Sequence, residues 1–270
     1  MNVPLKQAAR NDIIMPIAGM ALLLLLWELF TRFDGVPAYI LPGPLDVLQA
    51  SIEGWPSLAH SWWFTIKITL GALLLACLGG ILIATVFSML PYLERALTPL
   101  VIILQVTPIV AVAPLIMIYV DNTTAALLIC AWIVAFFPIL SNTLIGLRAV
   151  DKNLLDLFRL YEATSWQRLM LLRAPSALPY FLAGLKISGG LSLIGAVTAE
   201  MVAGVGGRNS GLASRILEAS FRMDIPRMYA ALMLLVLTGV LIYTLSNGLS
   251  RLLLGSWQSN GRDTADDAGL

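Results

Sequence analysis

Residues 63–90 read WFTIKITLGALLLACLGGILIATVFSML, an apolar run in which Lys67 is the single charged side chain. A helix needs about 20 mostly apolar residues to cross the hydrocarbon core of a bilayer. This run exceeds that length, so the sequence predicts a membrane-spanning helix here.

The composition of the whole chain agrees with this prediction. Of the 270 residues, 59% are hydrophobic and 12% are charged, and the mean hydropathy is +0.85. Soluble domains are about 45–50% apolar and about 25% charged. The sequence therefore predicts an all-α integral membrane protein surrounded by lipid. A net charge of +1 gives no support for a nucleic-acid partner.

Five further stretches have the length and apolar character of spanning helices, which makes about six in total. They are Ile13–Phe30, Leu97–Val120, Thr123–Leu147, Leu178–Gly204 and Met228–Gly255. We interpret residues 1–255 as a single transmembrane domain. Residues 256–270 are polar and are expected to form a short disordered tail.

The distribution of Lys and Arg predicts the orientation, because cytoplasmic loops are enriched in these residues. With the N-terminus inside, the cytoplasmic segments hold Lys6, Arg10, Arg95, Arg148, Lys152, Arg159, Arg168, Arg173, Arg251 and Arg262. The external segments hold Arg32, Arg208, Arg215, Arg222 and Arg227. Both termini are therefore expected on the cytoplasmic side, in a multi-pass topology.

The loop between the fourth and fifth spans, residues 148–177, is too polar to cross a membrane. Within it, Leu154, Leu157, Phe158 and Tyr161 recur at i, i+3, i+4 and i+7, which places them on one face of a helix. The sequence predicts a short amphipathic helix at the cytoplasmic surface.

A second helix is expected directly after the first. Thr164-Ser165-Trp166-Gln167 has the S/T-x-x-Q form of a capping box, which begins a helix. Pro175 is expected to end it, because a proline disfavours helical geometry in the preceding residue. The apolar faces of the two helices either pack on the ends of the spanning helices or bind a partner, and their periodicity leaves both alternatives open.

The run DLFRLYEATSWQRLMLLRAPSALPYFLAGLKIS, residues 156–188, resembles the cytoplasmic loop of permease subunits of bacterial ATP-binding-cassette importers. That family has Glu-Ala-Ala, three residues, Gly, about a dozen residues, Leu-Pro and a second Pro. On this chain Asp156 takes the Glu position and Glu162 the Gly position, and Pro175 and Pro179 take the two prolines. If the bend at Glu162 is left-handed, Glu costs about 1 kcal/mol relative to Gly.

Other segments resemble the same family. They are LPGP-x-x-VL at Leu41–Leu48, PLIMIY at Pro114–Tyr119 and TAEMVAGVGGRNSGLASRI at Thr198–Ile216. These features are similar to the branch that imports nitrate, sulfonates, taurine or pyrimidine-type compounds. The stretch AFFPILSNTLIGLR, Ala135–Arg148, resembles the members that import heterocycles.

This resemblance implies a non-catalytic permease in the bacterial inner membrane. Two copies would form the pathway, cytoplasmic ATPase subunits would bind ATP and Mg²⁺ and grip the loop, and an external binding protein would deliver the solute. No cofactor is expected on this chain. The residues expected to couple the loop to the ATPase are Asp156, Leu157, Phe158, Arg159, Tyr161, Glu162 and Pro175.

Polar groups inside apolar helices are candidates for the pathway or for a gate, since ionisable groups are costly in lipid. They are Gln105, Thr107, Ser141, Asn142, Lys186 and Glu200. The alternative for each is a structural hydrogen bond or, for Lys186, a side chain that reaches the membrane interface. The glycines from Gly204 to Gly211 are interpreted as a flexible external turn.

Two other classes of function stay open. A secondary carrier would work without an ATPase, and its transport would depend on an ion gradient. A membrane enzyme would have clustered His, Asp or Cys near one membrane face, and the sequence offers no such cluster and no metal-ligand spacing.

Overall fold

The computed structural model describes the backbone of residues 5–33, 37, 39–204 and 210–266, and the side chains of residues 15, 18–33, 37, 39–204 and 210–254. All regular elements in these residues are helical, which confirms the predicted all-α class. The elements are α1 (Leu5–Phe33), α2 (Pro44–Glu53), α3 (Trp55–Met89), α4 (Pro91–Val106), α5 (Ile109–Tyr119), α6 (Thr123–Arg148), α7 (Lys152–Leu160), α8 (Ser165–Arg168), the π-helix η1 (Leu169–Arg173), α9 (Ala174–Ala203), α10 (Leu212–Phe221) and α11 (Ile225–Asp266).

Four helical segments among the described residues are long and apolar enough to cross a membrane. They are Trp55–Met89, Thr123–Arg148, Ser165–Ala203 and Ile225–Leu254, and α4 with α5 can make a fifth. The expected span Ile13–Phe30 lies within α1, part of whose side chains are outside the described residues. The protein is therefore a multi-pass membrane protein, and the count of six spans stays a prediction.

The third expected span, Leu97–Val120, is not one continuous helix. It is divided into α4 and α5, which are bent by 98° relative to each other. The cause is Pro108, since a proline restricts the preceding residue to extended geometry. Thr107 has φ −68° and ψ 123°, which ends α4.

The predicted stop at Pro175 is wrong. The helix that begins at Ser165 continues through η1 and Pro175 to Ala203. In η1 the amide of Ala174 donates to the carbonyl of Leu169, five residues earlier. This wider turn directly precedes the proline, where the ring would otherwise clash with the carbonyl four residues before it.

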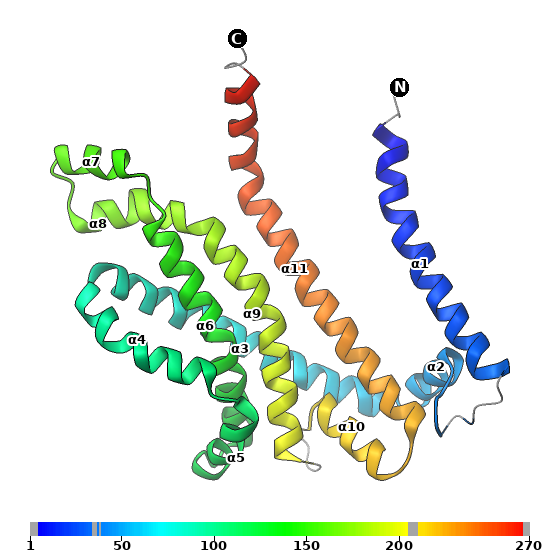
Figure 1. Cartoon of the computed structure of the whole chain (residues 1–270). Helices are drawn as coiled ribbons and strands as arrows, with labels where there is room; N and C mark the ends of the chain where they lie inside the picture. The colour runs from blue at the N-terminus through cyan, green and yellow to red at the C-terminus, as the bar shows by residue number, and fades with distance from the viewer. Residues whose placement is uncertain (1–4, 34–36, 38, 205–209, 267–270) are drawn as a thin grey trace.

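The start of α1 and the end of α11 lie on the same side of the molecule as the α7–α8 loop, whereas α2, α5 and α10 lie on the opposite side (Figure 1). The orientation of the termini in the membrane stays a prediction. Helix α11 continues to Asp266, into the segment expected to form the tail. Residues 267–270 lie outside the described part.

The core is centred on α3, α6 and α9, which pack side by side (Figure 1). Close approach of α6 and α9 depends on glycines: a Cβ at Gly146 would lie 2.8 Å from the Cα of Ala177. On the opposite helix, a Cβ at Gly184 would lie 2.8 Å from the carbonyl oxygen of Pro138. Small residues at such interfaces let membrane helices pack closely. The hydroxyl of Ser188 adds a 2.6 Å hydrogen bond from α9 to the carbonyl of Ala135.

Candidate functional site

Helix α7 carries the predicted docking face, and none of its residues is buried. Leu154 and Leu157 are each 46% exposed, and Tyr161, directly after the helix, is 78% exposed. Phe158 is half-buried. The spanning helices therefore leave most of this apolar face uncovered, in contrast to the alternative in which it packs on their ends.

Charged side chains in and directly before α7 bond to groups within the same loop. Asp151 caps the helix and accepts a 2.7 Å hydrogen bond from the amide of Asn153. Asp156 and Arg159 form a 2.9 Å ion pair, and both side chains are about two-thirds exposed. Such exposed pairs contribute little to stability. Both groups are thus accessible beside the apolar face.

The bend after α7 is left-handed at Glu162, where φ is 51°. The amide of Ala163 donates to the carbonyl of Phe158 at 2.9 Å, and the amide of Glu162 donates to the carbonyl of Arg159 at 2.9 Å. This pair of bonds is a Schellman motif, in which glycine is the favoured left-handed residue. Glu162 therefore adopts the left-handed conformation in which glutamate costs more than glycine. The bend stores a small backbone strain.

The predicted capping box at the start of α8 is confirmed. The hydroxyl of Thr164 accepts from the amide of Gln167 at 3.2 Å, and the Gln167 side chain accepts from the amide of Thr164 at 2.8 Å. The turn between α7 and α8 is thus held by the Schellman motif at the end of α7 and by the capping box at the start of α8.

The six polar candidates for the pathway do not form one cluster. Gln105 and Thr107 are exposed at the end of α4, and Ser141 and Asn142 are half-buried on α6. Among the described residues, no hydrogen bond joins two of the six.

Two of these residues make local bonds. The Asn142 amide donates to the carbonyl of Pro138 at 2.8 Å, and the Thr107 hydroxyl donates to the carbonyl of Ile103 at 2.7 Å. Both bonds join residues four apart on or at the end of one helix. Lys186 is half-buried on α9. A role in the pathway stays a prediction for all of them.

Glu200, near the end of α9, is 1% exposed and joins three helices. Its Oε1 accepts a 2.8 Å bond from the Thr65 hydroxyl of α3, and its Oε2 accepts a 3.0 Å bond from the amide of Ala213 in α10. Thr65 in turn accepts a 2.9 Å bond from the amide of Leu212. Amides at the start of α10 are unsatisfied within the helix and favour a carboxylate.

Gly211 completes this arrangement, because a Cβ at that position would collide with the Glu200 carboxylate. Sequence reasoning identified Glu200 but missed Thr65 and the α10 amides, which are distant along the chain. The sequence feature that could have indicated a close contact here is Gly211, directly before the LASRI segment at residues 212–216. Of the expected external turn, residues 205–209 lie outside the described residues, and Gly204 has φ 81°.

Several helices that can cross a membrane, with an exposed amphipathic helix at one end, define a multi-pass membrane protein with a surface loop. Residues 76–255, more than half of the chain, match the family described as "Binding-protein-dependent transport system inner membrane component". The chain belongs to this family of ATP-binding-cassette transporter permeases.

Two curated relatives are similar over most of their length. The riboflavin transport system permease protein of Chloroflexus aurantiacus is 32% identical over 258 residues, which cover 91% of this chain and 90% of the relative. The formylaminopyrimidine transport permease protein of Halalkalibacterium halodurans is 30% identical over 244 residues, which cover 88% of this chain and 94% of the relative.

A solved structure has a similar fold. It is a crystal structure of an amino acid ABC transporter with histidines, and its fold matches this one with a TM-score of 0.61. The match covers 75% of this chain and 97% of the other, at 16% identity.

Replacing Glu162 with Gly should stabilise the protein by about 1 kcal/mol, because glycine adopts a positive φ without steric cost. Thermal unfolding of the purified chain in detergent measures this change. Tyr161→Gly is the control: its φ is −83°, so glycine there relieves no backbone strain and should destabilise. Lower stability of Glu162→Gly would show that its carboxylate makes a needed contact.

Gly211→Ala and Glu200→Ala form a double-mutant cycle. Glu200→Ala leaves two buried donors unpaired and should cost about 3 kcal/mol, and Gly211→Ala should cost about 1–3 kcal/mol through the clash. In the Glu200→Ala background the clash is gone, so the second change should cost at least about 1 kcal/mol less.

Unfolding free energies of the four proteins test this cycle. Gly190→Ala is the control, since a Cβ there meets nothing within 4 Å. Strict additivity of the two changes would contradict the packing of Gly211 against Glu200.

Proposed function

We propose that this chain is the permease subunit of an ATP-driven importer and forms the pathway for a small solute delivered by an external binding protein. The observation that carries the proposal is the uncovered apolar face of α7, on a chain of this transport family. ATP hydrolysis, with its Mg²⁺, then takes place on a partner subunit, and the permease itself is not an enzyme.

The partner proposed for α7 is the cytoplasmic ATPase. Leu157 and Phe158 offer an apolar contact, and Asp156 and Arg159 lie beside it as charged contacts. An apolar centre with a polar rim is typical of protein interfaces. The bend at Glu162 connects this helix directly to α8, so movement of the ATPase would reach the membrane through one short turn.

A second copy of this chain is the proposed partner within the membrane. Helix α1 stands apart from the core, joined to it mainly near α2 (Figure 1). Its side chains from Leu22 to Leu26 are 41–65% exposed. A homodimer would cover part of this surface, and lipid would cover the rest.

The proposed substrate is a pyrimidine-like heterocycle. The names of two relatives, a riboflavin and a formylaminopyrimidine permease, support this class. The alternatives are an importer of the same type for sulfonate, taurine or nitrate, and a secondary carrier that works without an ATPase.

Replacing Asp156 and Phe158 together with Ala should release or uncouple the ATPase, because both the apolar contact and its charged neighbour are lost. Co-purification of the ATPase with tagged permease should fall at least about tenfold, an effect of about 1.4 kcal/mol or more. The melting temperature of the isolated permease should change little, since neither residue is buried.

The matched control is Phe221→Ala with Arg222→Ala. This pair also removes one aromatic and one charged side chain, the charge being of opposite sign, and it is exposed at the end of α10, on the opposite side of the molecule (Figure 1). It should leave ATPase binding unchanged. Full ATPase recovery and transport in the Asp156/Phe158 variant would rule out the proposed docking helix.

The energy source and the substrate are tested together in proteoliposomes that contain the permease, with the ATPase and binding protein from neighbouring genes. Uptake of a labelled pyrimidine should require ATP and persist when an ionophore abolishes ion gradients. Excess unlabelled pyrimidine should compete, and taurine, sulfonate or nitrate should not. Uptake that collapses with the gradient while ATP is present would identify a secondary carrier.

A further inference from the structure

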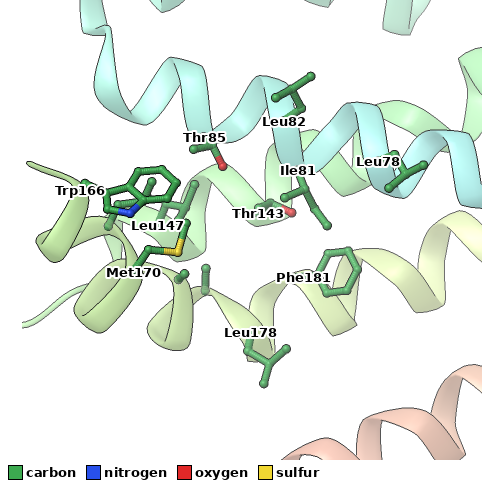
Figure 2. Close-up of a pocket in the computed structure, with 13 residues that line it drawn as sticks. Leu78, Ile81, Leu82, Thr85, Thr143, Leu147, Trp166, Met170, Leu178 and Phe181 are labelled. Carbon is green, nitrogen blue, oxygen red and sulfur yellow. The ribbon is translucent and has the colours of Figure 1, made fainter.

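An apolar groove lies between α3, α6 and the start of α9, at the end of the bundle that carries the loop. Its volume is about 570 Å³. Figure 2 shows Leu82 of α3, Leu147 of α6 and Phe181 of α9 along it, with the indole of Trp166 at one end. The lining is almost entirely hydrocarbon, so a polar solute would gain little there.

One polar group in the groove has no partner. Thr143 is 4% exposed, and among the described residues its hydroxyl makes no hydrogen bond. A buried hydroxyl without a partner is costly.

A smaller, basic pocket of about 240 Å³ adjoins the groove, and Leu169 lines both. Arg173 donates a 3.1 Å bond to the carbonyl of Ser88, and Arg168 donates a 3.2 Å bond to the Ser165 hydroxyl. The Nε of Arg168 is buried and unpaired in the described part of the chain. Neither arginine forms an ion pair with a described carboxylate.

The surroundings add further positive potential to this pocket. Arg148 and Arg159 are close enough to interact electrostatically with Arg173, although each is paired with a carboxylate of its own. Pro91, at the start of α4, also lines the pocket. The N-terminus of a helix attracts anions. Two guanidinium groups without a described carboxylate partner thus line a pocket that has no acidic residue in its lining.

We propose that an anionic phospholipid occupies both spaces, with its phosphate at Arg168 and Arg173 and an acyl chain in the groove. The shared wall at Leu169 makes one amphipathic molecule fit better than a free phosphate, which would leave the apolar groove empty. Basic pockets between spanning helices on the cytoplasmic side bind lipid headgroups. This site goes beyond the proposed function, because it needs neither the ATPase nor the solute.

The test uses the purified, delipidated full chain and native mass spectrometry with added phosphatidylglycerol or phosphatidylcholine. The wild-type protein should retain phosphatidylglycerol preferentially. Arg168→Gln with Arg173→Gln should weaken its retention roughly twentyfold and leave phosphatidylcholine unchanged. Arg168→Lys with Arg173→Lys should keep most of the binding, because the charge is preserved.

A second variant tests the groove without altering charge. Leu82 is 65% exposed, so Leu82→Trp fills the groove with little risk to the fold, and it should weaken retention of both lipids. The matched charge control is Arg95→Gln with Arg251→Gln: both arginines are exposed and outside the basic pocket. This control should bind phosphatidylglycerol like the wild type.

Five outcomes would overturn the inference. Equal retention of the two lipids, or no effect of the double glutamine variant, would remove the headgroup site. Competition by glycerol phosphate as strong as by the whole lipid would assign the pocket to a free phosphate. If Leu82→Trp separated a dimer into monomers with lipid retention intact, the groove would be a contact between two copies. If the arginine changes altered only ATPase binding, the pocket would belong to that interface.

Discussion

A chain inside a bilayer must pair its own backbone N–H and C=O groups, because the hydrocarbon offers no water to do so. This constraint explains the all-helical architecture, and each departure from a regular helix carries its own compensation. At the break between α4 and α5, the Thr107 amide and hydroxyl both bond the carbonyl of Ile103. In η1 the Ala174 amide finds the carbonyl five residues back. At the start of α10 the free amides bond Thr65 and Glu200.

Charged side chains are paired differently at the two ends of the bundle. On the side of α10, Glu200 is buried and its two carboxylate oxygens accept hydrogen bonds from two neighbouring helices. On the side of the loop, Arg168 and Arg173 lack a described carboxylate, and α7 leaves its apolar face open. The Glu200 cluster is satisfied within the single chain, whereas the described residues leave the apolar face of α7 and the two arginines without such partners.

Sequence reasoning predicted what depends on local pattern. Hydropathy located the apolar runs that form α3, α6, α9 and α11. The helical spacing of Leu154 to Tyr161 located α7, and the capping box at Thr164 is present as expected. It failed where a residue's effect depends on its neighbours in space. Pro108 broke a span that hydropathy joined, whereas Pro175 failed to end a helix because a π-turn precedes it. The Thr65–Glu200 contact spans 135 positions, so no window along the chain could reveal it.

The unbroken helical run from Ser165 to Ala203 has a mechanical consequence. At 1.5 Å per residue its 39 residues make a path of about 58 Å, which carries the loop at one end and Glu200 near the other. The π-turn at Leu169–Arg173 lies between the loop and the rest of this run, and hydrogen bonding there is less regular than in an α-helix. If a partner grips α7 as proposed, the compliance of this turn would limit how much of the displacement is transmitted to the opposite end of the run.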